Sequence, residues 1–301
     1  MMKLKEIEER LLKENYIPNK NILYALLGSI NQNIPLLIEG APGVGKTSLA
    51  KTVAQMLSIP LFRVQFYEGL TADKILYDYD YQKQLLTIES IKSVLENNLQ
   101  NKSIEEAIGY VNKIDFYNKD FLIKRPILNS IMQDSKCVLL LDEVDKSSEE
   151  IEYTLLEILD EFSVTIPQYG TIKCNENFKP IVFLTSNNYR DLSDALKRRC
   201  NYLYIEEKTL EEMQKIIKAQ CEVNDKIANA ISKSLIEIKK LDLEQIPSIV
   251  EAITWTDYLM KNKDDIEDIE HSICLLAKNK EDFDRIKTSG IVQKNLENIY
   301  D

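Results

Sequence analysis

Residues 34–50 read IPLLIEGAPGVGKTSLA, and this stretch decides how the rest of the chain is interpreted. The apolar run from Leu36 to Ile38 predicts a short strand, which breaks into a glycine-rich turn and resumes as a helix near Lys46. The glycines allow backbone conformations that a Cβ would hinder, so successive N–H groups can turn inward beside the positive end of the helix. The spacing GxxxxGK[ST] between a strand and a helix therefore predicts a phosphate-binding loop.

A loop of this kind predicts ATP and Mg²⁺ as ligands. The ammonium of Lys46 is expected to reach the β- and γ-phosphates, and the hydroxyl of Thr47 is expected to bind Mg²⁺. The residues expected to bind the nucleotide are Gly40, Ala41, Pro42, Gly43, Val44, Gly45, Lys46, Thr47 and Ser48.

A second phosphate-handling element is predicted at residues 137–146, CVLLLDEVDK. Its four apolar residues Val138 to Leu141 suit a strand that is buried on both faces of a parallel sheet. Two acids follow at the carboxyl end of that strand, where such sheets bind ligands. We expect Asp142 to hold Mg²⁺ through water and Glu143 to polarise the water that attacks the γ-phosphate.

Two further polar groups follow a third predicted strand, Pro180 to Leu184. Asn187 stands where a side-chain amide can orient the attacking water between the two phosphate-handling elements, the alternative being an Asn-Asn turn without a chemical role. A short helix at Asp194 to Cys200 ends in adjacent arginines, and this is the expected place for an arginine supplied to a neighbouring subunit's ATP. Arg199 is the preferred candidate, and Arg198 is the second.

The segments around these motifs give less definite predictions. Residues 1–33 predict two helices, and Tyr16 or Ile17 between them either lies nearest the adenine or belongs to the core. No alternation of helix and strand is obvious from Tyr67 to Gln133, where residues 95–117 suggest a polar loop with a short helix and Phe121–Met132 a helix. The tyrosine-rich stretch Tyr67–Gln84 is either a partner-facing insertion or a small local aromatic core.

Downstream of residue 206 the pattern changes to helices alone. The predicted helices are Leu210–Cys221, Asp225–Leu241, Ile249–Asn262 and Ile266–Lys280. The expected fold is therefore α/β, with a parallel sheet flanked by helices in residues 1–206 and a smaller, all-helical lid domain in residues 207–301.

Composition limits the partners and the compartment. Asp and Glu number 49 and Lys and Arg 38, which gives a net charge of -11 and makes nucleic acid an unfavourable partner. There is no apolar run long enough to cross a membrane, and the charged, helix-patterned N-terminus predicts a cytoplasmic protein. The five cysteines are scattered without a CxxC pair, which favours neither a disulfide framework nor a zinc site.

With these motifs in order, the sequence resembles the MoxR family of AAA+ ATPases, and in particular its CoxD-like branch. The resemblance rests on GAPGVGKT and LLLDEVDK together with the stretches YEGLTADKILYDYDYQKQLL, FLIKRPIL, FSVTIPQYGTI, LTSNNYRDLSDALKRRC and PSIVEAITW. It implies a hexameric ring that hydrolyses ATP between subunits, an insertion in the second helix near Tyr67–Gln84, and a hairpin at Phe162–Cys174 before sensor 1. Asn187 matches sensor 1, and Arg199 matches the arginine finger. The family analogy also implies a von Willebrand factor A domain partner and a chaperone role in maturing a client enzyme, including insertion of a metal centre.

The sequence departs from the family pattern in the lid. Many AAA+ proteins carry a sensor 2 arginine early in the third lid helix, whereas Leu241–Met260 contains no Lys or Arg. Either the lid senses the γ-phosphate in a different way, or a residue such as Gln245 or Ser248 replaces the arginine. Two other functions stay open at this point: a nucleic-acid-directed AAA+ motor, similar to McrB or a helicase loader, and a nucleotide-responsive scaffold with negligible turnover.

Overall fold

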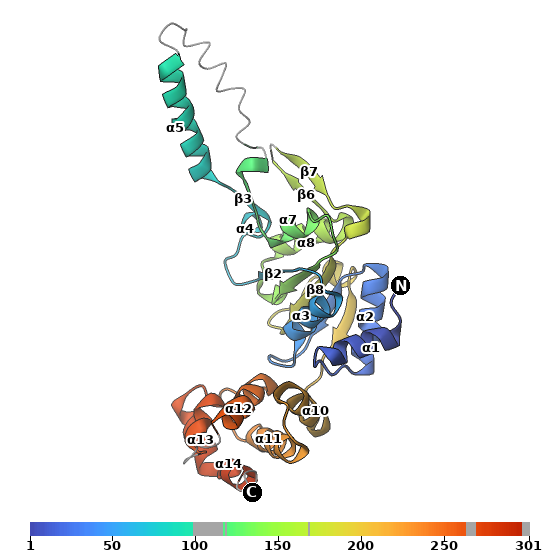
Figure 1. The fold of residues 1–301 in the computed structure, drawn as a ribbon, viewed down its shortest axis with the longest axis vertical. Coiled ribbons are helices and arrows are strands. Elements are labelled where there is room, and N and C mark those ends of the chain that lie inside the picture. Colours follow the sequence, from blue (N-terminus) through green and yellow to red (C-terminus); the bar gives the residue numbers. More distant parts are fainter. Residues whose placement is uncertain (99–116, 118, 168, 263–268, 297–301) are drawn as a thin grey trace.

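The protein is described by a computed structural model that covers residues 1–98, 117, 119–167, 169–262 and 269–296. Figure 1 shows a sheet flanked by helices in the middle of the molecule. The C-terminal helices form a separate group at one end, and helix α5 (Tyr81–Asn98) projects at the other end.

The main sheet has five parallel strands in the order β2-β5-β8-β1-β9. The strands are β1 (Leu36–Glu39), β2 (Leu61–Gln65), β5 (Val138–Asp142), β8 (Ile181–Ser186) and β9 (Asn201–Tyr204). In register, Leu36 of β1 pairs with Phe183 of β8, and Val138 of β5 pairs with Ile181 of β8. The loop after β1 and the acids after β5 therefore lie on either side of β8, at one edge of the sheet. This arrangement confirms the predicted α/β class.

Both faces of the sheet are buried, as four consecutive apolar residues in a strand predict. Leu140 packs in one hydrophobic cluster, while its neighbours Leu139 and Leu141 pack in another on the opposite face. The first face is covered by α1 (Leu4–Lys13), α2 (Lys20–Gln32) and α3 (Lys46–Leu57), and the second by α4 (Ala72–Leu76), α7 (Pro126–Ile131) and α8 (Glu149–Glu161). Burying each such leucine side chain contributes roughly 1.5–3 kcal/mol to folding. The strands are thereby held rigidly, and the sheet edge becomes a fixed platform for the site.

The region from Tyr67 to Gln133 differs from its prediction. It contains two short antiparallel strands, β3 (Tyr77–Tyr79) and β4 (Leu122–Lys124), with α5 between them and a 3-10 turn, η1 (Lys119–Phe121), before β4. The predicted helix at Phe121–Met132 is wrong before Pro126, because a proline forces the preceding residue out of the helical region. Arg125 accordingly is extended, with φ -81° and ψ 169°, and α7 begins only at the proline.

The tyrosines of this region divide between the two interpretations. Tyr77 and Tyr79 pack on the core beneath, and their rings lie edge to face with their centroids 5.8 Å apart. Tyr67 and Tyr81 are exposed instead. Of the loop expected at residues 95–117, the first four residues belong to α5, and 99–116 lie outside the described residues.

Three other predicted features of the first 206 residues are present. The break between α1 and α2 contains Asn19, whose side chain accepts a hydrogen bond from the N–H of Ile22 and so caps α2. The predicted hairpin is formed by β6 (Ser163–Ile166) and β7 (Gly170–Lys173). The short helix predicted at Asp194–Cys200 is present as α9 (Asp194–Lys197), which ends before the two arginines; the 3-10 turn η3 (Glu176–Phe178), between β7 and β8, was not predicted.

The C-terminal helices share a hydrophobic core of their own. They are α10 (Leu210–Cys221), α11 (Asp225–Ile238), α12 (Ile249–Lys261), α13 (Lys280–Ser289) and α14 (Ile291–Leu296), with a 3-10 turn, η4 (His271–Leu275). The only tryptophan of the chain, Trp255, is fully buried among them, and its indole N–H donates to Oγ of Ser272 at 2.8 Å.

The fourth predicted lid helix, Ile266–Lys280, is wrong where the chain is described. The segment forms η4, and a new helix then begins after Asn279, whose side chain accepts a hydrogen bond from the N–H of Asp282 at 2.7 Å. That cap starts α13, whereas η4 has already ended at Leu275. Across the part of the chain that the structure describes, helices that combine enough length with enough apolar character to span a bilayer are absent.

Candidate functional site

The loop between β1 and α3 forms a backbone cradle against two other parts of the chain. Gly40 and Gly43 have φ of +152° and +78°, values that side chains rarely allow. A Cβ on Gly40 would lie 2.4 Å from the carbonyl oxygen of Ile205, and one on Gly43 would lie 2.3 Å from Cβ of Ser248 in the lid. The loop therefore fits only as glycine at both positions. Helix α3 begins directly after it at Lys46, so its free N–H groups and its positive dipole end favour binding of an anion in the loop.

Lys46 lies within this cradle and is almost fully buried. Its Nζ donates to the carbonyl oxygens of Gly40 at 2.6 Å and Ala41 at 2.9 Å. Burial lowers the pKa of Lys46, and the negative charges of Asp145, Asp142 and Glu143 oppose that shift, in this order of strength. The ammonium is thus held by two backbone carbonyls and feels the charge of three carboxylates.

Asp142 joins the two motifs that the sequence separates by almost a hundred residues. Its Oδ1 accepts hydrogen bonds from Oγ1 of Thr47 at 3.0 Å and of Thr185 at 2.5 Å. Its Oδ2 accepts from Nε of Arg63 at 3.0 Å and from a terminal guanidinium nitrogen at 2.6 Å. A carboxylate beside a threonine hydroxyl at a helix N-terminus is the oxygen-ligand set that Mg²⁺ prefers, so these residues fit that metal.

Glu143 follows in a left-handed conformation, with φ 59° and ψ 48°. Its N–H donates to Oγ1 of Thr185 at 2.9 Å, which fixes the turn, while its carboxylate pairs with Lys146 at 2.6 Å. The hydrogen bond and charge of Glu143 raise the pKa of Lys146. The side chain of Glu143 is 29% exposed, so water reaches the carboxylate next to the phosphate loop.

Asn187 lies beyond the end of β8 and is held through its backbone. Its N–H donates to Oδ2 of Asp145 at 2.9 Å, and the N–H of Tyr189 donates to the same oxygen at 2.8 Å. Within the described part of the chain, the side-chain amide of Asn187 makes no hydrogen bond, so it is available to a ligand. The structure thus brings Lys46, Thr47, Asp142, Glu143 and Asn187 together at one sheet edge.

The sequence analysis missed three members of this group: Asp145, Thr185 and Arg63. Asp145 carried a signal, because it is a third acid in the DEVDK run, and Thr185 stands two residues before Asn187. The contact of Arg63 with Asp142 left no signal in the sequence, since an exposed position on a neighbouring strand does not reveal its partner.

The arginine pair lies apart from this group. Arg199 makes a two-armed ion pair with Asp160 at the end of α8, with both N–O distances 2.6 Å, and this contact lowers the pKa of Asp160. Arg198 is exposed and has no ion pair with any residue that the structure describes. Neither arginine contacts the phosphate loop of its own chain.

Tyr16 and Ile17 lie between α1 and α2. Tyr16 packs against the hydrophobic cluster under the loop, and its hydroxyl is 4.0 Å from where a Cβ on Gly45 would stand. Burial raises the pKa of Tyr16. Tyr16 therefore reaches the loop, whereas Ile17 is only partly buried beside it.

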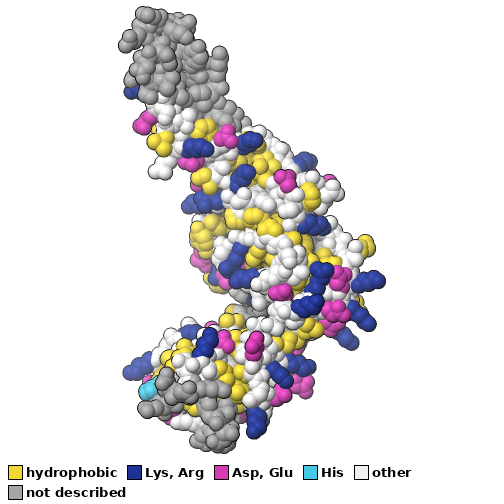
Figure 2. Space-filling model, in the orientation of Figure 1, with side chains coloured by type: hydrophobic (Ala, Val, Ile, Leu, Met, Phe, Trp, Pro, Cys, Tyr) yellow, Lys and Arg dark blue, Asp and Glu magenta, His cyan; other side chains and the backbone are white. Residues whose placement is uncertain are grey.

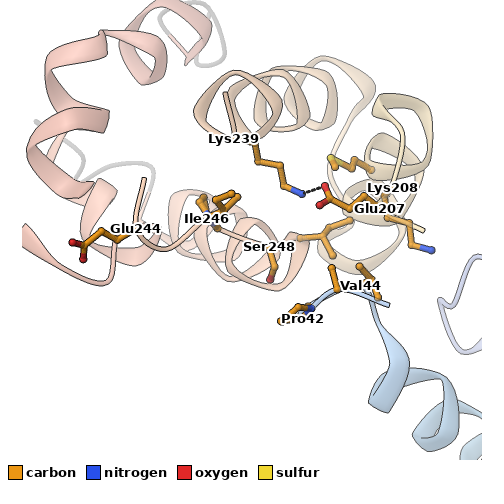
Figure 3. A pocket seen from close by; sticks show the side chains of 13 residues that line it. Pro42, Val44, Glu207, Lys208, Lys239, Glu244, Ile246 and Ser248 are labelled. Carbon is orange, nitrogen blue, oxygen red and sulfur yellow. Dashed lines mark hydrogen bonds and ion pairs between the residues drawn. The ribbon is translucent and has the colours of Figure 1, made fainter. Parts of the chain in front are cut away.

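A pocket of ≈ 320 Å³ is lined by residues of both the loop and the lid (Figure 3). Ser248, the N-cap of α12, faces the loop there, whereas Gln245 turns its N–H to Asp282. Two lysines outside Leu241–Met260 also line the pocket. Lys239 donates to Glu207 at 2.7 Å, as Figure 3 shows, and burial lowers the pKa of Lys208. The complete lining is Ala41, Pro42, Gly43, Val44, Glu207, Lys208, Met213, Lys239, Glu244, Ile246, Pro247, Ser248 and Ile249.

A profile of the AAA domain (dynein-related subfamily) matches residues 35–200, which include the whole cluster around Asp142. The chain belongs to this family. Its fold, a parallel sheet with flanking helices followed by a helical domain, agrees with that assignment.

Among curated proteins, the chain is similar to the chaperone protein ClpB of two bacteria. It is 26% identical to the Mycoplasma pneumoniae protein over 213 residues, 64% of this chain and 24% of that protein. It is 25% identical to the Prochlorococcus marinus protein over 257 residues, 81% of this chain and 25% of that protein. The chain thus spans about a quarter of the length of these relatives.

Among solved structures, the chain is similar to the RuvB Holliday junction branch migration motor of Thermotoga maritima. The identity is 17%, the TM-score is 0.47, and the match covers 92% of this chain and 67% of that one.

Proposed function

We infer that this AAA domain hydrolyses ATP in the presence of Mg²⁺ and uses the reaction to remodel a protein client. The observation that carries this inference is the meeting of Thr47 and Asp142 at 3.0 Å beside the cradle that contains Lys46. These three groups come from two elements far apart in the sequence, and together they provide an ammonium, a hydroxyl and a carboxylate at one anion-binding loop.

The loop and Lys46 bind the triphosphate. Backbone N–H groups at the start of α3 donate to phosphate oxygens, and the Lys46 ammonium exchanges the carbonyls of Gly40 and Ala41 for the β- and γ-phosphates. Thr47 and Asp142 would hold Mg²⁺, which supplies neutralisation of the phosphate charge. Thr185 and Arg63 keep the Asp142 carboxylate in a single orientation.

Glu143 and Asn187 act on the attacking water. The ion pair between Glu143 and Lys146 breaks, and water takes the place of the lysine beside the carboxylate. The Glu143 carboxylate then accepts a proton from that water, which the Asn187 amide orients. Most of the rate enhancement then comes from positioning and charge stabilisation, because phosphoryl transfer needs little covalent help from the protein.

Substituting Glu143→Gln tests the hydrolytic part of the proposal. The amide keeps the size of the side chain but removes the base, so turnover should fall by at least about 100-fold while ATP binding persists. Phosphate release and binding of a fluorescent ATP analogue measure the two quantities. The matched control is Glu149→Gln, an exposed acid on α8. Unchanged phosphate release from the Glu143 variant would remove Glu143 from the mechanism, and no release from the unsubstituted chain would refute the ATPase proposal.

The assembly is proposed to be a hexameric ring in the cytoplasm. The proposal assigns Arg199 to a neighbour's ATP, with Arg198 as the second candidate; Arg199 would first exchange its ion pair with Asp160 for the phosphate. Ile17 would lie near the adenine beside Tyr16. Sedimentation of the Glu143→Gln variant with ATP tests the ring, since a species larger than a single chain should form.

The client is proposed to be a protein. The relatives named as chaperones support this choice, as does the net charge of -11, which disfavours nucleic acid. On the face shown in Figure 2, Lys and Arg side chains are interspersed with Asp and Glu.

The finer proposal is a MoxR-type ATPase of the CoxD-like branch, working with a von Willebrand factor A domain protein to mature a client enzyme, including insertion of a metal centre. It rests on the sequence stretches quoted above. Co-purification with a von Willebrand factor A domain protein encoded nearby is the expected result. ATP turnover that rises with DNA and falls steeply with salt would point instead to a nucleic-acid motor.

A further inference from the structure

Asp145 is a buried carboxylate next to the ATP site, on the 3-10 turn η2 (Val144–Lys146) that follows β5. Its side chain has no exposed surface. A buried charge is costly unless it is hydrogen-bonded or paired. Its Oδ2 has such partners in the N–H groups of Asn187 and Tyr189, so Asp145 connects the turn after β5 to the loop after β8.

The burial of the second oxygen of Asp145 is not explained by hydrogen bonds. Oδ1 is buried and has no hydrogen-bond partner among the described residues. Leaving a buried acceptor unsatisfied is unfavourable, and such an atom in a folded protein calls for a specific reason. Holding the loop does not provide one, because Oδ2 alone accepts both N–H groups.

The charge of Lys46 offers a reason, because Asp145 acts on it electrostatically without forming an ion pair. Of the three carboxylates that raise the pKa of Lys46, Asp145 has the strongest influence, ahead of Asp142 and Glu143. Lys46 at present donates to Gly40 and Ala41, and an ammonium has three donors. Asp145 therefore acts electrostatically on the lysine that binds phosphate, while its Oδ2 holds the loop that carries Asn187.

We propose that Asp145 is a positioning residue of the ATPase site, whose Oδ2 fixes the Asn187 loop and whose charged Oδ1 draws the Lys46 ammonium toward the side of the site where Asn187 lies. The proposal rests on the inferred ATPase activity and adds a residue to it. In this arrangement one carboxylate sets the distance between the group that binds the phosphate and the group that orients water. A structural role alone would require only the first of its two oxygens.

The Asp145→Asn substitution tests the roles of the two carboxylate oxygens separately. The amide oxygen of asparagine can accept both loop N–H groups, while the charge and the second acceptor are lost. Turnover should fall by about 10- to 100-fold, because small displacements of positioned groups have effects of this size. ATP should bind about 3- to 10-fold more tightly, because a negative charge near the triphosphate and Lys46 has been removed. Slower catalysis together with tighter binding is a pattern that general damage to the fold does not produce.

The experiment compares the Asp145→Asn, Asp145→Ala and Asp191→Asn variants with the unsubstituted chain. Asp191 is a fully exposed acid after the same loop and should leave every quantity unchanged. Phosphate release gives kcat, titration with a fluorescent ATP analogue gives the dissociation constant, and thermal unfolding reports the fold. Asp145→Ala loses both loop bonds as well, so it should unfold at a lower temperature than Asp145→Asn.

The outcomes separate the two proposals. Unchanged kcat and affinity in Asp145→Asn would show that Oδ1 has no role, and weaker ATP binding with a lowered unfolding temperature would show a purely structural one. Either result overturns the proposal. If the unsubstituted chain releases no phosphate, the ATPase proposal fails, while the comparison of ATP affinities still decides whether Asp145 acts on the phosphate-binding lysine.

Discussion

Replacing Thr185 with valine should destabilise the sheet domain by about 3 kcal/mol, although the two side chains have nearly the same shape. Thr185 is 1% exposed and lies on β8, beside the carboxyl end of β5. Its hydroxyl donates to Oδ1 of Asp142 at 2.5 Å and accepts the N–H of Glu143 at 2.9 Å. A single hydroxyl thus binds both the Asp142 carboxylate at the end of β5 and the backbone of Glu143 after it.

The magnitude follows from those two bonds. A hydrogen bond to a charged group contributes about 1.5–3 kcal/mol, and leaving a buried donor unsatisfied costs about 1–3 kcal/mol. Asp142 keeps Thr47 and Arg63 as partners, which limits the first loss to the lower part of its range. Valine leaves no cavity, so no packing loss is added.

Urea unfolding followed by far-UV circular dichroism measures the effect. With a denaturant slope of about 2–3 kcal/mol per molar, a loss of 3 kcal/mol lowers the midpoint by about 1 M. Thr185→Ser keeps the hydroxyl and should lose much less. A Thr185→Val midpoint within about 0.2 M of the unsubstituted protein would refute the reasoning, since it would mean that the two hydrogen bonds contribute almost nothing.

Two further predictions concern the contacts of the phosphate loop. Neither Lys46→Ala nor Arg199→Ala subunits alone should turn over ATP at an appreciable rate. A mixture should regain activity, because the Lys46→Ala subunit supplies the arginine and the Arg199→Ala subunit supplies an intact loop. No gain in phosphate release at any mixing ratio would argue against sites shared between subunits. Gly43→Ala should weaken ATP binding by about tenfold or more, because its Cβ would lie 2.3 Å from Ser248 and overpacking of this kind costs about 1–3 kcal/mol. Adding Ser248→Gly should restore part of the affinity measured with a fluorescent ATP analogue, and affinity unaffected by Gly43→Ala alone would contradict the contact.

The parts of the site that the sequence predicted are those encoded locally. The phosphate loop is a contiguous motif, and its glycines are required where they stand by positive φ and by close neighbours. The strand before Asp142 was recognisable because Val138 to Leu141 are all apolar, which a sheet buried on both faces requires. For such elements, residue type and spacing are sufficient.

The parts that were missed depend on partners distant in the chain. Thr185 is an ordinary polar residue in a strand until the β5–β8 register sets it beside Asp142. Arg63 gains its partner only because β2 pairs with β5. Register between non-adjacent strands is a property of the whole sheet, and no local pattern reveals it.

The wrong helix boundaries had a different cause, because the residues that set the true boundaries are local and visible in the sequence. Pro126 should have ended any helix before it, and Asn279 followed by acids is an N-cap signal for a new helix. In both places the apolar run at helical spacing was given more weight than the proline or the N-cap asparagine.

The position of the single tryptophan has a practical consequence. Trp255 is enclosed in the C-terminal core and held by Ser272, and the sheet domain has no indole of its own. Its fluorescence therefore reports from one half of the molecule alone, without any attached dye. Emission recorded during a nucleotide titration, compared with the circular dichroism of the whole chain, distinguishes a rearrangement inside the helical half from one confined to the sheet.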